Sequence, residues 1–341
     1  MKINLKNFFS TDKKISKIGD FQELKDIEGL QISSISAGLY STTREDLSLF
    51  YFPEGANYAV AYTQNSIVSE SITWNRENTK NNIKALVVNT KNANTFTGDQ
   101  GMNSLDEIAK TLVESLRKQE TINGFGKTKV KDILFASTGI IGEKFPLDKI
   151  KSNIPNLVSN LRINQNKIIW LKVASAIMTS DTKPKVAYSE IKLGDKTVRI
   201  AAIAKGSGMI APNLATMFSF IFTDADITAV VLNKLLHKVL PNTFNAITVD
   251  SDTSTNDMVA IFSTKKIKNK NLNTISSKES LKFEKALKTV CLDLAKQIIV
   301  DGEGAKKFII IKTINSETLE RAKKICFSIA NSPLVKTAIA G

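Results

Sequence analysis

The sequence is poor in the residues that many enzymes use for acid–base and metal chemistry. Its 341 residues include one histidine and two cysteines. His237 lies in a helical pattern at 227–240 and lacks the partners that a Ser-His-Asp triad or a metal site requires. Cys291 and Cys326 also fall in helical patterns, so we expect two buried, reduced thiols. The sequence therefore indicates neither a histidine-based hydrolase nor a disulfide scaffold.

Long apolar runs and aromatic residues are scarce as well. No stretch is long enough to cross a bilayer, and the N-terminus lacks the apolar core of a signal peptide. The net charge is +14, but the lysines are scattered, the aromatic content is 7%, and only 264–270 forms a short basic run. We therefore expect a cytoplasmic protein without a membrane or nucleic-acid partner, and keep a basic binding module as an alternative.

The sequence does contain enough apolar residues for a large core, at 42% of the chain. Apolar strand patterns and amphipathic helix patterns interleave along its whole length, which predicts α/β layers with sheets sandwiched by helices. Strands are predicted at 31–39, 47–52, 57–63, 67–74, 84–90, 132–136, 198–204, 217–222, 245–249, 258–262 and 308–313. Helices are predicted at 104–116 (after a capping box at Ser104), 147–161, 167–178, 226–240, 280–299 and 316–330.

The most informative stretch is 205–217, which reads K-G-S-G-M-I-A-P-N-L-A-T-M. Gly206 and Gly208 permit unusual backbone conformations, and Pro212 fixes its own φ. Thr216 follows, and threonine is a weak nucleophile unless a base activates it. Cleavage of the chain just before Thr216 would supply that base as a new α-amine, with a pKa near ~8. The residues themselves leave two interpretations open, a nucleophile or a tight turn between core strands.

Two other motifs in this half of the chain imitate known binding loops. Gly206-x-Gly208-x-x-Ala211 follows a strand like a dinucleotide fingerprint, but that fingerprint must open a helix, and a strand is predicted next. The acidic run 250–257 resembles a calcium loop, but it lacks the glycine at its sixth position, and Ile261 occupies its twelfth. We therefore predict no nucleotide site and interpret 250–257 as a structural or site-lining turn.

Three further loops carry candidate binding groups. The small residues of 137–142 can offer backbone N–H groups and a hydroxyl to an oxyanion. The hydroxyl-rich loop 179–182 can hold a small polar substrate, and Glu303, between two glycines, can face an ammonium group. Each of these loops can equally be a plain turn.

Taken together, these loops resemble the ornithine acetyltransferase family, also called glutamate N-acetyltransferases, of arginine biosynthesis. The resemblance runs from about Ile32 to Gly341. The segments that carry it, in order, are Asn92-Ala93-Asn94 with Thr97-Gly98, Ala136-Ser137-Thr138-Gly139, 176–182, 205–213, Ala215-Thr216-Met217, Thr248-Val249-Asp250, 252–257, 301–305 and 330–338.

The resemblance implies an αββα architecture akin to that of N-terminal-nucleophile hydrolases. It implies self-cleavage between Ala215 and Thr216 into pieces 1–215 and 216–341, which associate as a dimer of cleaved heterodimers. Thr216 would accept acetyl from N-acetylornithine and pass it to glutamate, without metal or cofactor. The sequence leaves open whether acetyl-CoA can also donate the acetyl group. Thr138 and Gly139 match the family's oxyanion pair. The matching substrate-binding positions are Thr182, Lys205, Thr216 and Glu303.

Members of this family continue beyond the position of Gly341, so we expect the second piece to be short at its C-terminus and to expose core surface there. Two alternatives therefore stand beside the acetyltransferase. One is an N-terminal-nucleophile amidase or aminopeptidase, in which water replaces glutamate as the acceptor. The other is an inactive truncated homologue.

Overall fold

The structure is a computed structural model that describes residues 23–79, 82–211, 217–269, 272 and 274–340. Its strands form one sheet in the order β4-β3-β2-β8-β7-β6-β5, with β1 paired to β2. The strands are β1 (Gln31–Ile35), β2 (Leu47–Tyr62), β3 (Asn82–Asn89), β4 (Ile133–Ser137), β5 (Lys185–Leu193), β6 (Lys196–Lys205), β7 (Phe218–Ala225) and β8 (Met258–Ile267). The helices are α1 (Glu70–Asn78), α2 (Gly98–Asn123), α3 (Leu147–Ser159), α4 (Lys167–Ala176), α5 (Ala229–Val239), α6 (Lys278–Val300), α7 (Leu319–Ala330) and α8 (Pro333–Ala340).

The long strand β2 belongs to both halves of the sheet. Its first half pairs with β1 and β3, its second half pairs with β8, and its register with β3 shifts between Tyr51 and Ala56. The sheet bends here, so that Phe50 stacks on Phe222 of β7 with ring centroids 4.9 Å apart. One buried cluster accordingly contains residues of both β3–β4 and β6–β7. The sheet therefore doubles into two facing layers.

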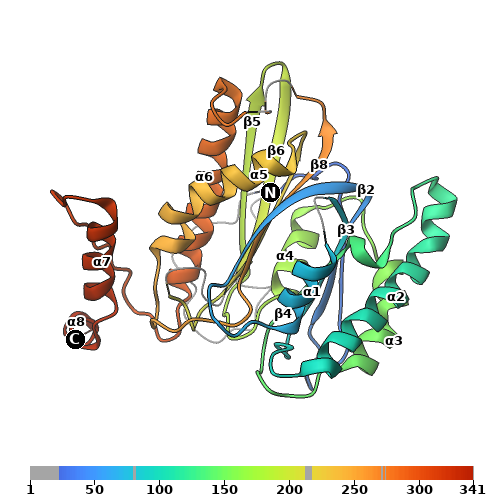
Figure 1. Ribbon diagram of the computed structural model, residues 1–341, viewed down its shortest axis with the longest axis horizontal. Coiled ribbons are helices and arrows are strands. Elements are labelled where there is room, and N and C mark those ends of the chain that lie inside the picture. Colours follow the sequence, from blue (N-terminus) through green and yellow to red (C-terminus); the bar gives the residue numbers. More distant parts are fainter. Residues whose placement is uncertain (1–22, 80–81, 212–216, 270–271, 273, 341) are drawn as a thin grey trace.

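Helices cover the outer faces of these two layers. Helices α5 and α6 pack on the outer face of β5–β8, and α2 and α3 pack on the outer face of β2–β4 (Figure 1). Strand β6 shows how the sequence achieves this, because Val198, Ile200 and Ala202 face the α5–α6 side while Ala201 and Ile203 face the interior between the layers. The predicted α/β layered architecture is confirmed.

Most predicted elements occur close to their predicted bounds, but three predicted strands are wrong. Residues 67–74 run into helix α1, residues 245–249 overlap the end of a short 3-10 helix (Phe244–Ala246), and 308–313 has no regular structure. Segment 308–313 has the composition of a strand, but no described strand pairs with it, and an unpaired strand is not stable. The predicted capping box at Ser104 is also wrong, since α2 has its N-cap at Thr97, about two turns earlier, and the Ser104 hydroxyl donates to the Gln100 carbonyl.

Helices α7 and α8 stand apart from the layered body (Figure 1) and contain no buried residue. Both cysteines are free, but only Cys291 is buried, so the prediction of two buried thiols is wrong for Cys326. Cys326 lies on α7, and because that helix packs loosely its thiol is only half-buried. In the described part of the chain, no helix is both long and apolar enough to span a membrane.

Candidate active site

Two of the predicted site residues meet where the layers face each other. Thr138 follows the last residue of β4, Lys205 ends β6, and Lys205 Nζ lies 3.0 Å from Thr138 Oγ1. The same ammonium donates to Thr179 Oγ1 at 3.0 Å. Both Thr138 and Lys205 are almost fully buried. The bend in the sheet therefore joins the predicted oxyanion loop 137–142 and the predicted nucleophile stretch 205–217.

Lys205 is a buried cation without a directly bonded carboxylate among the described residues. Burial lowers the pKa of its ammonium below 10.5, while the negative charges of Asp181 and Asp257 oppose that shift. Its Nζ also lies 5.7 Å from the centre of the Phe218 ring, on β7. The ammonium is thus held by hydroxyl groups and an aromatic face in a largely dry environment.

The oxyanion loop has a backbone that only glycine fits. Gly139 has a φ of 138°, and a Cβ there would lie 2.1 Å from the Lys91 carbonyl carbon. On either side of it, the Thr138 N–H donates to Asn89 O and the Ile140 N–H donates to Lys91 O. Below the loop, the Asn256 amide donates to the Ser137 carbonyl at 2.7 Å. These bonds fix the orientation of the Gly139 peptide.

Thr182, a predicted substrate-binding residue, is hydrogen-bonded to the carboxylate of Asp301. Its backbone N–H donates to Asp301 Oδ2 at 3.0 Å, and its hydroxyl donates to Asp301 Oδ1. Asp301 follows the last residue of α6 and is itself bonded to Lys185 at 2.6 Å. The predicted hydroxyl-rich loop 179–182 is therefore tied to the end of α6 as well as to Lys205.

Glu303 lies against the glycine turn after β6. Its N–H donates to the Ser207 carbonyl at 2.9 Å, and a Cβ on Gly208 would lie 2.7 Å from Glu303 Oε1. The Ser207 hydroxyl in turn is 2.8 Å from that of Ser180. Glu303 is exposed, so its carboxylate is available to a ligand.

The predicted nucleophile Thr216 and its neighbour Ala215 lie outside the described residues. Met217 is the first described residue after them, and its N–H donates to Asp257 Oδ1 at 2.7 Å. One residue later, Phe218 is the register partner of Lys205. The acidic run 250–257, interpreted as a site-lining turn, also holds the residues before the gap, because Asp250 accepts the N–H groups of Met209 and Ile210.

Sequence reasoning missed Asp257 and three charged residues, Asp181, Lys185 and Asp301. Asp257 Oδ2 has no hydrogen-bond partner among the described residues, and burial raises the pKa of this carboxyl well above its usual value. The sequence marks Asp181 and Asp301 only as members of polar loops. Because Lys185 lies 116 positions from Asp301, no local spacing could have predicted their ion pair.

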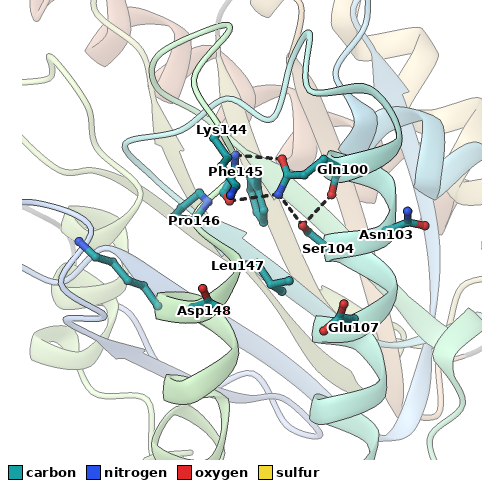
Figure 2. A pocket seen from close by; sticks show the side chains of 10 residues that line it. Gln100, Asn103, Ser104, Glu107, Lys144, Phe145, Pro146, Leu147 and Asp148 are labelled. Atoms are coloured by element: carbon teal, nitrogen blue, oxygen red, sulfur yellow. Dashed lines mark hydrogen bonds between the residues drawn. The ribbon is translucent and has the colours of Figure 1, made fainter.

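The two larger hollows found among the described residues are not centred on Lys205 and Thr138. A cleft of about 760 Å³ opens between the N-terminal turns of α2 and α3, where Gln100 pairs with both backbone polar groups of Phe145 (Figure 2). It contains none of the predicted site residues. A groove of about 690 Å³ between the C-terminal part of α6 and α7 includes Glu303 at its edge, but its lining is mostly apolar.

The chain is similar to known proteins in sequence and in fold. The ArgJ family model matches residues 31–341. The arginine biosynthesis bifunctional protein ArgJ of Gluconobacter oxydans is 40% identical over 320 residues, which cover 94% of this chain and 72% of that protein. The protein of the same name from Nitrobacter winogradskyi is 42% identical over 330 residues, covering 94% and 76%.

A solved structure, the PH0078 protein from Pyrococcus horikoshii, superposes with a TM-score of 0.50 over 84% of this chain and 90% of that chain. Its sequence identity is 11%, so this likeness shows the fold alone. The family match and the curated relatives confirm the predicted arginine-biosynthesis acyltransferase. The chain belongs to the ArgJ family.

Proposed function

We propose that this protein is a glutamate N-acetyltransferase that cleaves itself between Ala215 and Thr216. Thr216 then takes acetyl from N-acetylornithine, releases ornithine, and passes the acetyl group to glutamate. The single observation that supports this proposal best is the bond from Lys205 Nζ to Thr138 Oγ1, because it links the proposed oxyanion loop to the strand that leads into the nucleophile stretch.

The proposed first half-reaction is an acyl transfer. The new α-amine of Thr216 accepts the hydroxyl proton, the Thr216 oxygen bonds to the acetyl carbon, and the amide C–N bond then breaks as ornithine leaves with that proton. In the second half-reaction the amine of glutamate attacks the acetyl ester and restores the Thr216 hydroxyl. Both tetrahedral intermediates place a negative charge on the former carbonyl oxygen, which requires hydrogen-bond donors nearby.

Thr138 is suited to be one of those donors because of Lys205. An ammonium has only hydrogen-bond donors, so in this pair the Thr138 oxygen must accept. The Thr138 hydroxyl proton is then directed away from Lys205 and is available to an oxyanion. The Gly139 N–H, in a peptide fixed by its neighbours, is the second proposed donor.

Thr182 and Glu303 are the proposed contacts for the rest of the substrate, with Glu303 facing an ammonium group and Lys205 contributing positive charge for a carboxylate. No cofactor is required by this scheme, and acetyl-CoA is an alternative acetyl donor. We further propose that pieces 1–215 and 216–341 stay together through the β6–β7 pairing and form a dimer of heterodimers in the cytoplasm.

The intact mass of the denatured protein tests the cleavage. Two pieces that meet at Ala215/Thr216 are expected, whereas a single chain of 37.5 kDa would contradict the proposal. Acetylornithine is then supplied with and without glutamate, and wild type is compared with Thr216→Ala. Transfer to glutamate should require Thr216. Hydrolysis that is fast without glutamate would favour the amidase alternative.

A further inference from the structure

A buried ion triad lies directly behind the candidate site. Lys185, the first residue of β5, is almost completely buried, and its Nζ lies 2.6 Å from Asp181 Oδ1 and 2.6 Å from Asp301 Oδ2. The Lys183 carbonyl accepts a third bond at 3.2 Å. The three hydrogens of the ammonium thus each have an acceptor.

Each carboxylate of the triad holds a different part of the site. Asp181 accepts the Gly206 N–H at 2.6 Å and the Thr179 N–H at 3.1 Å. Gly206 follows Lys205 in the chain, and the Thr179 hydroxyl accepts a hydrogen bond from Lys205. Asp301 accepts both the N–H and the hydroxyl of Thr182. Lys185 is the group that joins these two sets of contacts.

The surrounding positive charges keep Asp181 ionised. Burial raises the pKa of Asp181, but the ammoniums of Lys185 and Lys205 and the Gly206 N–H outweigh that effect and bring the pKa to about 2. Removing three charges from water is costly, and such groups often stabilise a fold no better than apolar residues of similar size. The contacts of this triad instead fix the relative positions of three loops, which is what a transfer site needs.

We propose that Lys185 is a positioning residue of the acetyl-transfer site, which acts through Asp181 and Asp301 to hold Thr179, Gly206 and Thr182 in one arrangement. This inference rests on the proposed function. In that scheme Lys185 and Asp181 belong to piece 1–215 and Asp301 to piece 216–341. A carboxylate from the second piece, Asp301, would thus help to hold groups that all belong to the first piece.

The test separates positioning from simple stabilisation. Lys185→Met leaves two buried carboxylates with too little positive charge, so it should lower stability and also lower kcat/KM for acetyl transfer by about 100-fold. Lys185→Met combined with Asp301→Asn removes one charge of each sign, so urea unfolding should show recovered stability. Its kcat/KM should stay low, because the bond between the loops is still missing.

Two further variants complete the design. Asp301→Asn alone keeps the ammonium and should lower kcat/KM by at least about tenfold even if both Lys185 variants fail to fold. Lys84→Met is the matched control, because Lys84 is a partly buried lysine 3.8 Å from the buried Glu120, away from the site. It should lose stability while its kcat/KM stays within about threefold of wild type.

The outcomes are distinct. Two results would overturn the inference while the proposed function stands. One is activity that returns together with stability in the double variant Lys185→Met/Asp301→Asn, and the other is an unchanged kcat/KM in Asp301→Asn. A wild-type protein that transfers no acetyl group from acetylornithine to glutamate would overturn the proposed function, and the inference with it.

Discussion

Lys205 reaches across the two layers of the sheet to donate a hydrogen bond to Thr138, with Nζ 3.0 Å from Oγ1. Lys205 ends β6 and Thr138 follows the last residue of β4, in different halves of the bent sheet, and the two are 67 positions apart in the sequence. A lysine that only attracted a substrate carboxylate would not need this partner. The geometry supports a second role for Lys205, in which it turns the Thr138 hydroxyl into a directed donor.

Thr138→Val should therefore lower kcat for acetyl transfer by roughly 100- to 1000-fold, the usual cost of losing one oxyanion donor. Thr138→Ser keeps the hydroxyl and should lose far less. Initial rates with saturating acetylornithine and glutamate measure both. Equal rates for the valine and serine variants would rule out a donor role for the hydroxyl.

The alkaline limb of the rate profile should depend on Lys205. In the proposed scheme, the Lys205 ammonium must donate to Thr138 so that the Thr138 hydroxyl faces the oxyanion. Burial lowers the pKa of this ammonium below 10.5, so kcat should fall as pH rises through that lowered pKa. Lys205→Arg keeps a cation that does not lose its proton in this range, so the limb should move to higher pH in whatever activity remains. The profile is measured from pH 6 upward; a limb at the same pH in both proteins would assign it to another group.

Two glycine substitutions should affect different properties, one the KM and the other the stability of the fold. Gly208→Ala brings a methyl group against the flexible end of Glu303, where the ideal Cβ would be 2.7 Å from Oε1, so it should raise KM with little loss of stability. Gly139→Ala instead meets backbone at 2.1 Å with a φ of 138°, so it should destabilise the fold by several kcal/mol. Urea unfolding and steady-state kinetics on both variants check this contrast.

The free energy of unfolding should depend on pH because of Asp224, which lies on β7. Burial raises the pKa of its carboxyl to about 6, and one of its oxygens has no hydrogen-bond partner among the described residues. Because the folded-state pKa lies above the unfolded value, the folded state loses stability as pH rises from about 4 to about 6 and stays at that lower level above it.

Asp224→Asn removes this titration. Relative to wild type, the variant should gain on the order of 2 kcal/mol between pH 4 and pH 7, from the linkage between pKa shift and unfolding free energy. Chemical unfolding at several pH values measures the gain. A difference between the two proteins that does not change with pH would mean that Asp224 titrates alike in both states.

Much of the fold follows from local patterns in the sequence, but helix α1 shows where such patterns fail. Its residues Ile72 and Trp74 alternate with polar ones as in a strand, whereas Ser71 and Asn75 are buried one helical turn apart. The Asn75 side chain bonds both polar groups of Phe135 in β4, at 2.8 and 2.9 Å, and thereby satisfies the unpaired edge of that strand. A polar residue that belongs in the interior cannot be recognised without its partner.

For the candidate site, too, the sequence identified some features and left others unpredicted. The family resemblance supplied Thr138, Lys205, Thr182 and Glu303 because each stands in a loop with a distinctive run of residues. The contacts between them depend on the bend of β2, and the ion triad depends on residues far apart in the chain, so neither is encoded in any local spacing. The placement of Thr216 stays a prediction.

The course of β2 also determines when the proposed self-cleavage could occur. Tyr62 of β2 pairs with Met258 of β8, a partner about 200 residues later, so the central contacts of the sheet have very high contact order. The ribosome must therefore release most of the chain before the two layers can close and bring Lys205 to Thr138. In the proposed scheme, cleavage before Thr216 would therefore come after strands from both ends of the chain have paired.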